Sequence, residues 1–208
     1  MYYSQKQIKF GSINTSEIEL RDLLKAWIAI SLAFGIVMSK SIFSSDFYLK
    51  FVMASLTVGT GFLLHELGHK IVAQKYGCFA EFRSFDNMLI LAIAMSFFGF
   101  ILAAPGAVMI SGRVNAEKNG KISAAGPIVN IALAIIFFGF ASLQLPAFFK
   151  VVAYYGFVIN SWLALFNMIP FWLFDGYKIW KWNKLAYLCI AGIAGTFMIL
   201  QHFIVLPK

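Results

Sequence analysis

The chain has 208 residues, of which 61% are hydrophobic and 12% charged, and its mean hydropathy is +0.79. Soluble globular domains are about 45–50% apolar and about 25% charged, so this composition excludes an ordinary soluble domain and predicts a polytopic membrane protein. The net charge of +8 comes from Lys and Arg residues scattered between apolar stretches, which argues against a nucleic-acid-binding face and fits membrane topology. The length predicts one membrane-embedded domain over residues 1–208.

The chain begins with two elements that the local pattern predicts. Residues 6–20 alternate loosely between apolar and polar side chains around turn-forming pairs, which favours a short hairpin at the membrane surface, with a loose tail as the alternative. Ser16 and Glu19 have the spacing of a helix capping box. We therefore expect a helix to begin there and to cross the membrane through residues 26–38.

The remaining apolar stretches predict further membrane segments. A second span covers residues 47–76 and ends at Gly77. The next apolar run, residues 88–111, has about 24 residues and is interrupted at Pro105 and Gly106, so we expect a re-entrant hairpin that turns there. Three more spans are predicted over residues 122–143, 149–174 and 185–206. The predicted fold is an all-α polytopic membrane protein with about five to six transmembrane helices, a re-entrant apolar segment and a short N-terminal hairpin.

Two histidines and a carboxylate lie inside the second predicted span. On a helix, His65 and His69 are one turn apart and face the same side, while Glu66 is turned by about 100° and can reach the open side of a shared metal ion. A single histidine there would more simply be a packed core residue. Each ionisable group at bilayer depth costs about 2.5–3.5 kcal/mol, however, so three in one turn call for a compensating ion. The H-E-x-x-H spacing therefore predicts a zinc site.

A catalytic zinc usually has three protein ligands and a water, so the two histidines need a partner. We favour Asp175, because the aromatic residues around it would solvate a free carboxylate poorly. The alternatives lie either in polar connections, where a solvated carboxylate is the simpler interpretation, or in the last span, where a packed or terminal histidine is: Asp46, Glu81, Asp86, Glu117 and His202.

The order of the spans is compatible with contact between His65 and Asp175. His65 is late in the second span and Asp175 ends the fourth, so they meet at one depth only if both spans run in the same direction, which a re-entrant segment preserves. With the N-terminus inside, all but four of the 17 Lys and Arg residues fall on the cytoplasmic side. We therefore expect a multi-pass protein of the cell membrane whose site opens toward the cytoplasm.

Three motifs together resemble those of the site-2 protease family of intramembrane zinc metalloproteases, and most closely its small archaeal or bacterial members. They are His-Glu-Leu-Gly-His at 65–69, Ala-Gly-Pro-Ile-Val-Asn at 125–130, and Asn-Met-Ile-Pro at 167–170 followed by Phe-Asp-Gly at 174–176. The chain departs from the family at Phe174, where Leu is more frequent, and around Pro105, where the apolar insert exceeds the short sheet-forming connection of compact members.

The resemblance implies a function and roles for five residues. It implies one zinc ion per chain held by His65, His69 and Asp175, with Glu66 as the catalytic carboxylate and Asn167 near the substrate. The expected activity is intramembrane metalloendopeptidase cleavage of membrane-spanning or membrane-associated proteins, with the lipid bilayer as surroundings and no nucleic-acid partner. For Asn167 an interhelical hydrogen bond is an equally good interpretation.

The same residues also admit other interpretations. Asn130, close to Pro127, is explained by helix entry and close packing alone. A divalent-metal transporter using His65, Glu66 and His69 as an ion site is the alternative function, disfavoured because the polar residues converge on one depth and no repeat is evident. A catalytically silent bundle is disfavoured by the cost of burying Glu66 in the membrane. The sequence predicts neither the substrate nor an oligomeric state.

Overall fold

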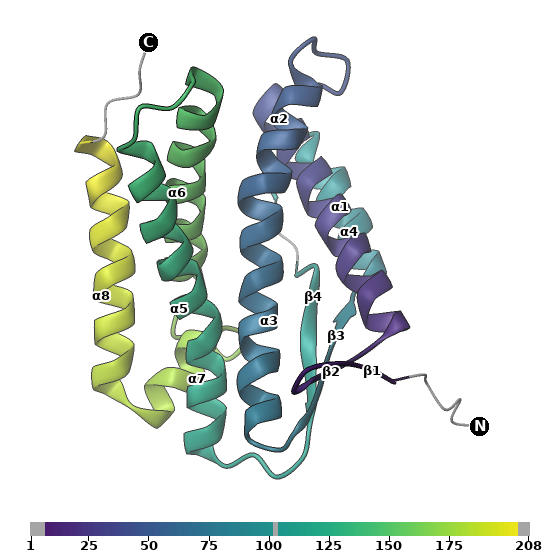
Figure 1. Cartoon of the computed structure of the whole chain (residues 1–208), viewed down its shortest axis with the longest axis vertical. Helices are drawn as coiled ribbons and strands as arrows, with labels where there is room; N and C mark the ends of the chain where they lie inside the picture. Colours follow the sequence, from purple (N-terminus) through teal and green to yellow (C-terminus); the bar gives the residue numbers. More distant parts are fainter. Residues whose placement is uncertain (1–6, 102–103, 204–208) are drawn as a thin grey trace. The chain divides into compact units, whose positions relative to one another are not determined.

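The computed structural model describes residues 7–101 and 104–203, and Figure 1 shows its elements in chain order. A π-helical turn covers Ser55–Gly59, and a 3-10 turn covers Gln201–Phe203. The strands are β1 (Gln7–Phe10), β2 (Ile13–Ser16), β3 (Phe79–Ser84) and β4 (Gly106–Ser111). The α-helices are α1 (Glu17–Ser39), α2 (Phe47–Ala54), α3 (Thr60–Lys75), α4 (Asp86–Ser96), α5 (Ala116–Ala141), α6 (Ala147–Asn167), α7 (Asp175–Trp182) and α8 (Lys184–Leu200).

Among the described residues, five helical segments are long and apolar enough to cross a membrane. They are Glu17–Ser39, Phe47–Lys75, Ala116–Ala141, Ala147–Asn167 and Lys184–Phe203. This confirms the predicted helical, polytopic class and its five main spans. The last three residues of the final predicted span, 204–206, lie outside the described residues.

The contacts divide the chain into two compact units. The N-terminal unit consists of Met1–Ser55 and Lys70–Arg113, and the C-terminal unit consists of Leu56–His69 and Val114–Lys208. Helix α3 therefore contributes its first part to the C-terminal unit and its last part to the N-terminal unit. One functional domain over residues 1–208 stays a prediction.

The start of the N-terminal unit matches the predicted hairpin and helix cap. Strands β1 and β2 pair antiparallel, with Gln7 opposite Ser16, and the residues before Gln7 lie outside the described part. The Ser16 hydroxyl accepts a hydrogen bond from the Glu19 backbone N–H at 3.2 Å, which caps α1. Helix α1 then packs against α2, α4 and β3 within this unit.

The apolar run 88–111 forms part of α4 and all of β4. Strand β4 pairs antiparallel with β3, with Phe79 opposite Ser111 and Ser84 opposite Gly106. The end of the run therefore lies beside the strand that precedes it, as a re-entrant segment requires. The predicted turn at Pro105 and Gly106 is wrong, because these residues already belong to the returning branch, where the Phe85 N–H donates to the Pro105 carbonyl at 3.0 Å. The sequence pattern predicted neither β3 nor β4.

Two helix boundaries in the C-terminal unit differ from those predicted. Helix α5 begins at Ala116 rather than near residue 122, because the Asn115 side chain caps it by accepting from the Lys118 N–H at 2.8 Å. Pro127 is thus inside α5 and not at its entry. Helix α6 ends at Asn167 rather than near Phe174, because a proline at 170 disfavours helical backbone at the residue before it.

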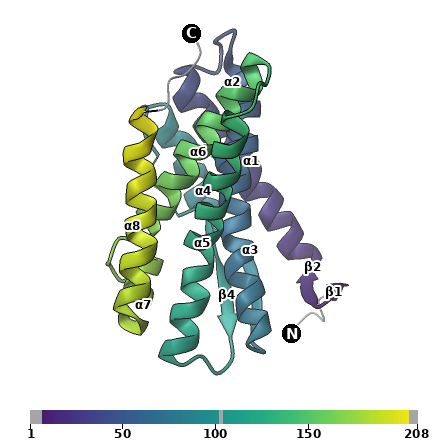
Figure 2. The same ribbon diagram turned by 60° about the vertical axis from the view of Figure 1, so that its left-hand side comes forward.

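In the C-terminal unit, the short helix α7 lies beside the long helix α5. Helix α6 packs against α5 and α8, and α7 contacts α5 and α8 (Figure 2). Buried side chains between these helices include Ala124, Met168, Ile179 and Ile190. This packing holds the first turn of α7, where Asp175 lies, within the same unit as the histidine-bearing part of α3.

Candidate metal centre

The two predicted histidines project from one face of α3 and are both buried. His65 and His69 are separated by one helical turn, as the spacing requires, and their Nε2 atoms lie 3.0 Å apart. Their side chains are buried in the folded chain, with relative exposures of 5% and 8%. The two ring nitrogens therefore face the same small volume away from solvent.

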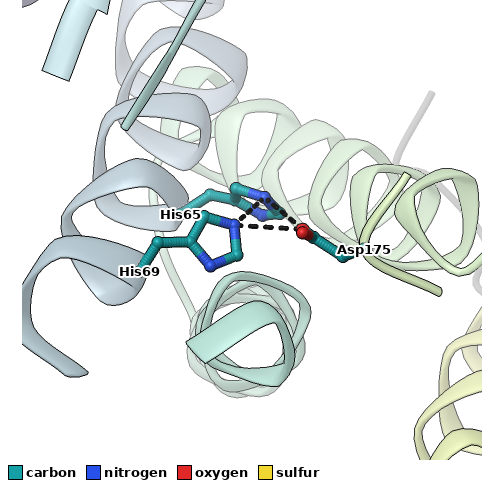
Figure 3. A group of neighbouring side chains, drawn as sticks. All are labelled: His65, His69 and Asp175. Atoms are coloured by element: carbon teal, nitrogen blue, oxygen red, sulfur yellow. Dashed lines mark hydrogen bonds and ion pairs between the residues drawn. The ribbon is translucent and has the colours of Figure 1, made fainter. Parts of the chain in front are cut away.

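Asp175 completes the group from the first residue of α7. Its Oδ2 lies 3.4 Å from the His65 Nε2 and 3.0 Å from the His69 Nε2, so all three side chains converge (Figure 3). The next residue, Gly176, lies against the backbone of Met168, where a Cβ atom would collide with the Met168 carbonyl group. A glycine after the aspartate thus lets the start of α7 approach the end of α6 and fixes where the carboxylate lies.

The geometry of these atoms fits a metal ion. Three ligand atoms, from His65, His69 and Asp175, all lie within 4.8 Å of one another. In tetrahedral zinc with bonds of about 2.0–2.1 Å, neighbouring ligand atoms are about 3.3 Å apart, close to the separations of 3.0–3.4 Å here. Two nitrogens and one carboxylate oxygen are also a ligand set that zinc accepts in catalytic sites.

Gly126 of α5 leaves space beside the two rings. A Cβ atom at this position would lie 2.5 Å from the Nε2 of His65 and 2.5 Å from the Nε2 of His69. Any side chain would therefore occupy the volume that the two ring nitrogens face. The glycine of the 125–130 motif thus leaves room for the histidine pair and for an ion.

The other ring nitrogens of the two histidines contact oxygen atoms. His69 Nδ1 lies 2.8 Å from the Ile122 carbonyl oxygen, and His65 Nδ1 lies 2.6 Å from the Asn130 Oδ1. A carbonyl can only accept, so His69 Nδ1 carries a proton, and in the neutral ring this leaves the lone pair on Nε2 for an ion. The sequence explains Asn130 by helix entry and close packing, and the structure adds a direct contact between its Oδ1 and His65.

Glu66 and Asn167 are the two predicted site residues outside the group of three. Glu66 follows His65 on α3 and is 9% exposed, and its catalytic role stays a prediction. The Asn167 amide donates to the Leu163 carbonyl of its own helix at 2.9 Å. This bond is local rather than interhelical, and a role near the substrate stays a prediction.

The alternative ligands from the sequence have other surroundings. Four carboxylates form ion pairs with nearby cationic side chains, and His202 is exposed. Asp46, Asp86 and Glu117 are at least partly exposed, as expected, but for Glu81 a solvated position is wrong, because it is buried in β3. The pairs are Asp46 with Lys50, Glu81 with Arg83, Asp86 with Lys25, and Glu117 with Lys121. Among the residues that the structure describes, the one group with metal-binding geometry is that of His65, His69 and Asp175.

Comparison with known proteins identifies two relatives from Methanocaldococcus jannaschii. The chain is 39% identical over 181 residues to "Putative zinc metalloprotease MJ0611", a match that covers 86% of this chain and 91% of the relative. It is 28% identical over 185 residues to "Zinc metalloprotease MJ0392", covering 86% of this chain and 45% of that longer protein. No protein-family model and no solved structure matches the chain.

Proposed function

The chain belongs to a family of zinc metalloproteases, and we propose that it is an intramembrane zinc metalloendopeptidase of the site-2 protease type. Its substrates are membrane-spanning or membrane-associated proteins, and it holds one zinc ion per chain through His65, His69 and Asp175. The observation that carries the proposal is the convergence of these three ligand atoms in a chain with five helices of membrane-spanning length.

Each site residue has a defined task in peptide hydrolysis. A zinc ion in such a site supplies a bound water of lowered pKa and polarises the carbonyl that is attacked. His65, His69 and Asp175 would hold the ion, the number of protein ligands that catalytic zinc sites have. Glu66, next to His65 on the same helix, accepts a proton from the attacking water and delivers it to the leaving amine.

A buried site selects for an unwound substrate. A substrate helix inside a bilayer keeps its carbonyl groups in its own hydrogen bonds, so the scissile segment must become extended before attack. Asn167 at the end of α6 is the residue we assign to hold that extended segment by hydrogen bonds from its amide. The excess of Lys and Arg on one side of the predicted spans favours a cell-membrane orientation with the site open to the cytoplasm.

The test is cleavage of a membrane-spanning reporter by purified full-length protein in lipid vesicles. Glu66→Gln is expected to retain zinc but to lose cleavage, because the amide cannot accept the proton. Glu117→Gln, which removes a carboxylate paired with Lys121 at the start of α5, is the matched control and keeps wild-type cleavage.

The same vesicles separate the protease from the metal transporter. Full cleavage of the reporter by Glu66→Gln would refute the role assigned to that carboxylate. Zinc flux across the vesicle membrane without any cleavage by wild-type protein would favour the transporter instead.

A further inference from the structure

The side chain of Asn130 lies deep inside the C-terminal unit and contacts three other groups. Its Oδ1 is 2.6 Å from the Nδ1 of His65. Its Nδ2 donates to the Gly61 carbonyl at 3.2 Å and to the Asn160 Oδ1 at 3.0 Å. Both asparagines are fully buried, at 0% exposure. Because a buried amide without partners costs about 1–3 kcal/mol, this set of mutual bonds is what makes burial of two asparagines tolerable.

Asn160 continues the chain of hydrogen bonds into α6 and is a residue that the sequence did not identify. Its Nδ2 donates to the Gly156 carbonyl of its own helix at 2.8 Å. A Cβ atom on Gly61 would lie 2.5 Å from the Asn160 Oδ1, so the close approach of Asn160 to α3 depends on a glycine there. A polar amide in the middle of an apolar span is the signal that could have identified this residue.

Two backbone carbonyls, those of Gly156 and Gly61, determine which way each asparagine amide faces. A carbonyl oxygen only accepts, so Gly156 requires the Asn160 amide nitrogen and leaves the Asn160 Oδ1 as an acceptor toward Asn130. Gly61 and Asn160 then both require the nitrogen of Asn130, which turns the Asn130 Oδ1 toward His65. An oxygen acceptor at 2.6 Å requires a proton on the His65 Nδ1, and its Nε2 is left with a lone pair.

We infer that Asn130 is a positioning residue for the zinc site, and that Asn160 orients it through the Asn160–Asn130–His65 relay. The inference rests on the proposed function, because it concerns a ligand of that site. It explains why both rings present Nε2 to the same volume: the Ile122 carbonyl fixes the tautomer of His69, and Asn130 fixes that of His65. Loss of such a partner of a metal-binding histidine typically weakens metal affinity by about 10–100-fold.

The experiment measures zinc affinity of the purified full-length protein by competition with a chromophoric chelator, and the visible spectrum of the cobalt-substituted form. Asn130→Leu removes the acceptor at similar volume and is expected to bind zinc about 10–100-fold more weakly, with an altered cobalt spectrum. Asn130→Asp keeps an oxygen facing His65, but its second oxygen meets the Gly61 carbonyl and the Asn160 Oδ1, which only accept. It is therefore expected to bind zinc more tightly than Asn130→Leu but more weakly than wild type.

Ser161→Ala is the matched control. The Ser161 hydroxyl is as fully buried as Asn160 and adjacent to it, but donates to the Phe157 carbonyl of its own helix at 2.7 Å. Its removal is expected to leave zinc affinity unchanged. Thermal unfolding of each variant shows whether it is folded. If Asn130→Leu does not fold, Asn160→Ala replaces it, with an expected loss of about tenfold in zinc affinity.

The outcomes separate this inference from the function on which it rests. Wild-type affinity in a folded Asn130→Leu or Asn160→Ala protein overturns the relay, and so does an Asn130→Asp protein that is as impaired as Asn130→Leu. Wild-type protein that binds neither zinc nor cobalt overturns the proposed function itself.

Discussion

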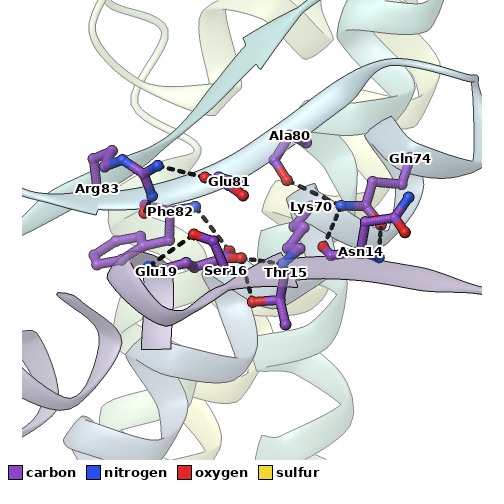
Figure 4. Close-up of polar contacts among 10 residues, drawn as sticks. All are labelled: Asn14, Thr15, Ser16, Glu19, Lys70, Gln74, Ala80, Glu81, Phe82 and Arg83. Carbon is purple, nitrogen blue, oxygen red and sulfur yellow. Dashed lines mark hydrogen bonds and ion pairs between the residues drawn. The ribbon is translucent and has the colours of Figure 1, made fainter. Parts of the chain in front are cut away.

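Lys70, the residue after His69 on α3, forms an ion pair with Glu19 of α1, and both side chains are almost completely buried (Figure 4). The Glu19 carboxylate also accepts from the Thr15 hydroxyl at 2.6 Å and from the Phe82 N–H at 2.9 Å. One carboxylate thus ties together strands β2 and β3 and helices α1 and α3 within the N-terminal unit. The surrounding bonds are those that a buried charge pair needs to be tolerated.

Removal of one partner of this pair is expected to destabilise the protein strongly. Glu19→Ala leaves the Lys70 ammonium buried without its counter-charge, which typically lowers the free energy of unfolding by about 3–5 kcal/mol. Reversible unfolding of the detergent-solubilised protein by denaturant measures this change.

The double variant distinguishes an ion-pair effect from lost packing. Glu19→Leu combined with Lys70→Met removes both charges, and we expect it to be closer to wild type than Glu19→Ala is. A double variant less stable than Glu19→Ala would show that the unpaired charge does not cause the loss of stability in Glu19→Ala.

Gly126→Ala tests whether the volume beside the histidines holds an ion. The new methyl group would lie 2.5 Å from both Nε2 atoms, so we expect zinc binding to be lost while the chain still folds. Gly192→Ala in α8 is the matched control, since nothing lies within 4 Å of a Cβ there. That substitution should leave zinc content unchanged and raise stability by about 0.5–1 kcal/mol. Full zinc content in Gly126→Ala would contradict the location of the ion.

Zinc is expected to stabilise the folded protein by mass action. A ligand that binds only the folded state adds about 2.7 kcal/mol at a free concentration 100 times its dissociation constant. Treatment with a chelator should therefore lower the midpoint of thermal unfolding, and added zinc should restore it. His69→Ala should show neither response, and an equal response in that variant would place the stabilising ion elsewhere.

Lys178 is predicted to have a small effect on the site. Its Nζ lies 3.6 Å from the Asp175 Oδ1, the oxygen not facing the imidazoles, and its side chain is 38% exposed. Pairs this exposed contribute about 0.2–1 kcal/mol, and a cation beside a ligand carboxylate also repels a metal cation, so the two effects oppose each other. Lys178→Met should therefore change zinc affinity by less than about fivefold in chelator competition, and Lys178→Arg by less still. A loss of 100-fold would mean that Lys178 contacts the ion or its water.

The sequence predicted which side chains converge where the signal was local or chemically unusual. His65 and His69 are separated by one helical turn, so their contact follows from α-helix geometry alone. Asp175 is 106 positions beyond His69 in the sequence, yet a carboxylate among aromatic residues was informative enough to pair it with them.

Of the features that the sequence did not predict, two depend on pairing between distant residues and one on a local helix cap. Strand β4 is mostly apolar, and periodicity cannot distinguish a short apolar strand from a helix, so its pairing with β3 was missed. The start of α5 was placed too late because polar residues after Asn115 looked like a loop, although Asn115 caps a helix. The contact of Asn130 was not predicted because its partner, His65, is 65 residues away and only the fold brings them together.

The most direct test of the zinc centre is X-ray absorption at the zinc edge of the full-length protein, with Asp175→Ala measured beside wild type. We predict one zinc per wild-type chain, with two imidazole nitrogens and carboxylate and water oxygens at about 2.0–2.2 Å. In Asp175→Ala the metal should be lost or its carboxylate contribution should disappear. A zinc shell that is identical in the two proteins, or a wild-type protein that takes up no zinc, would contradict the account.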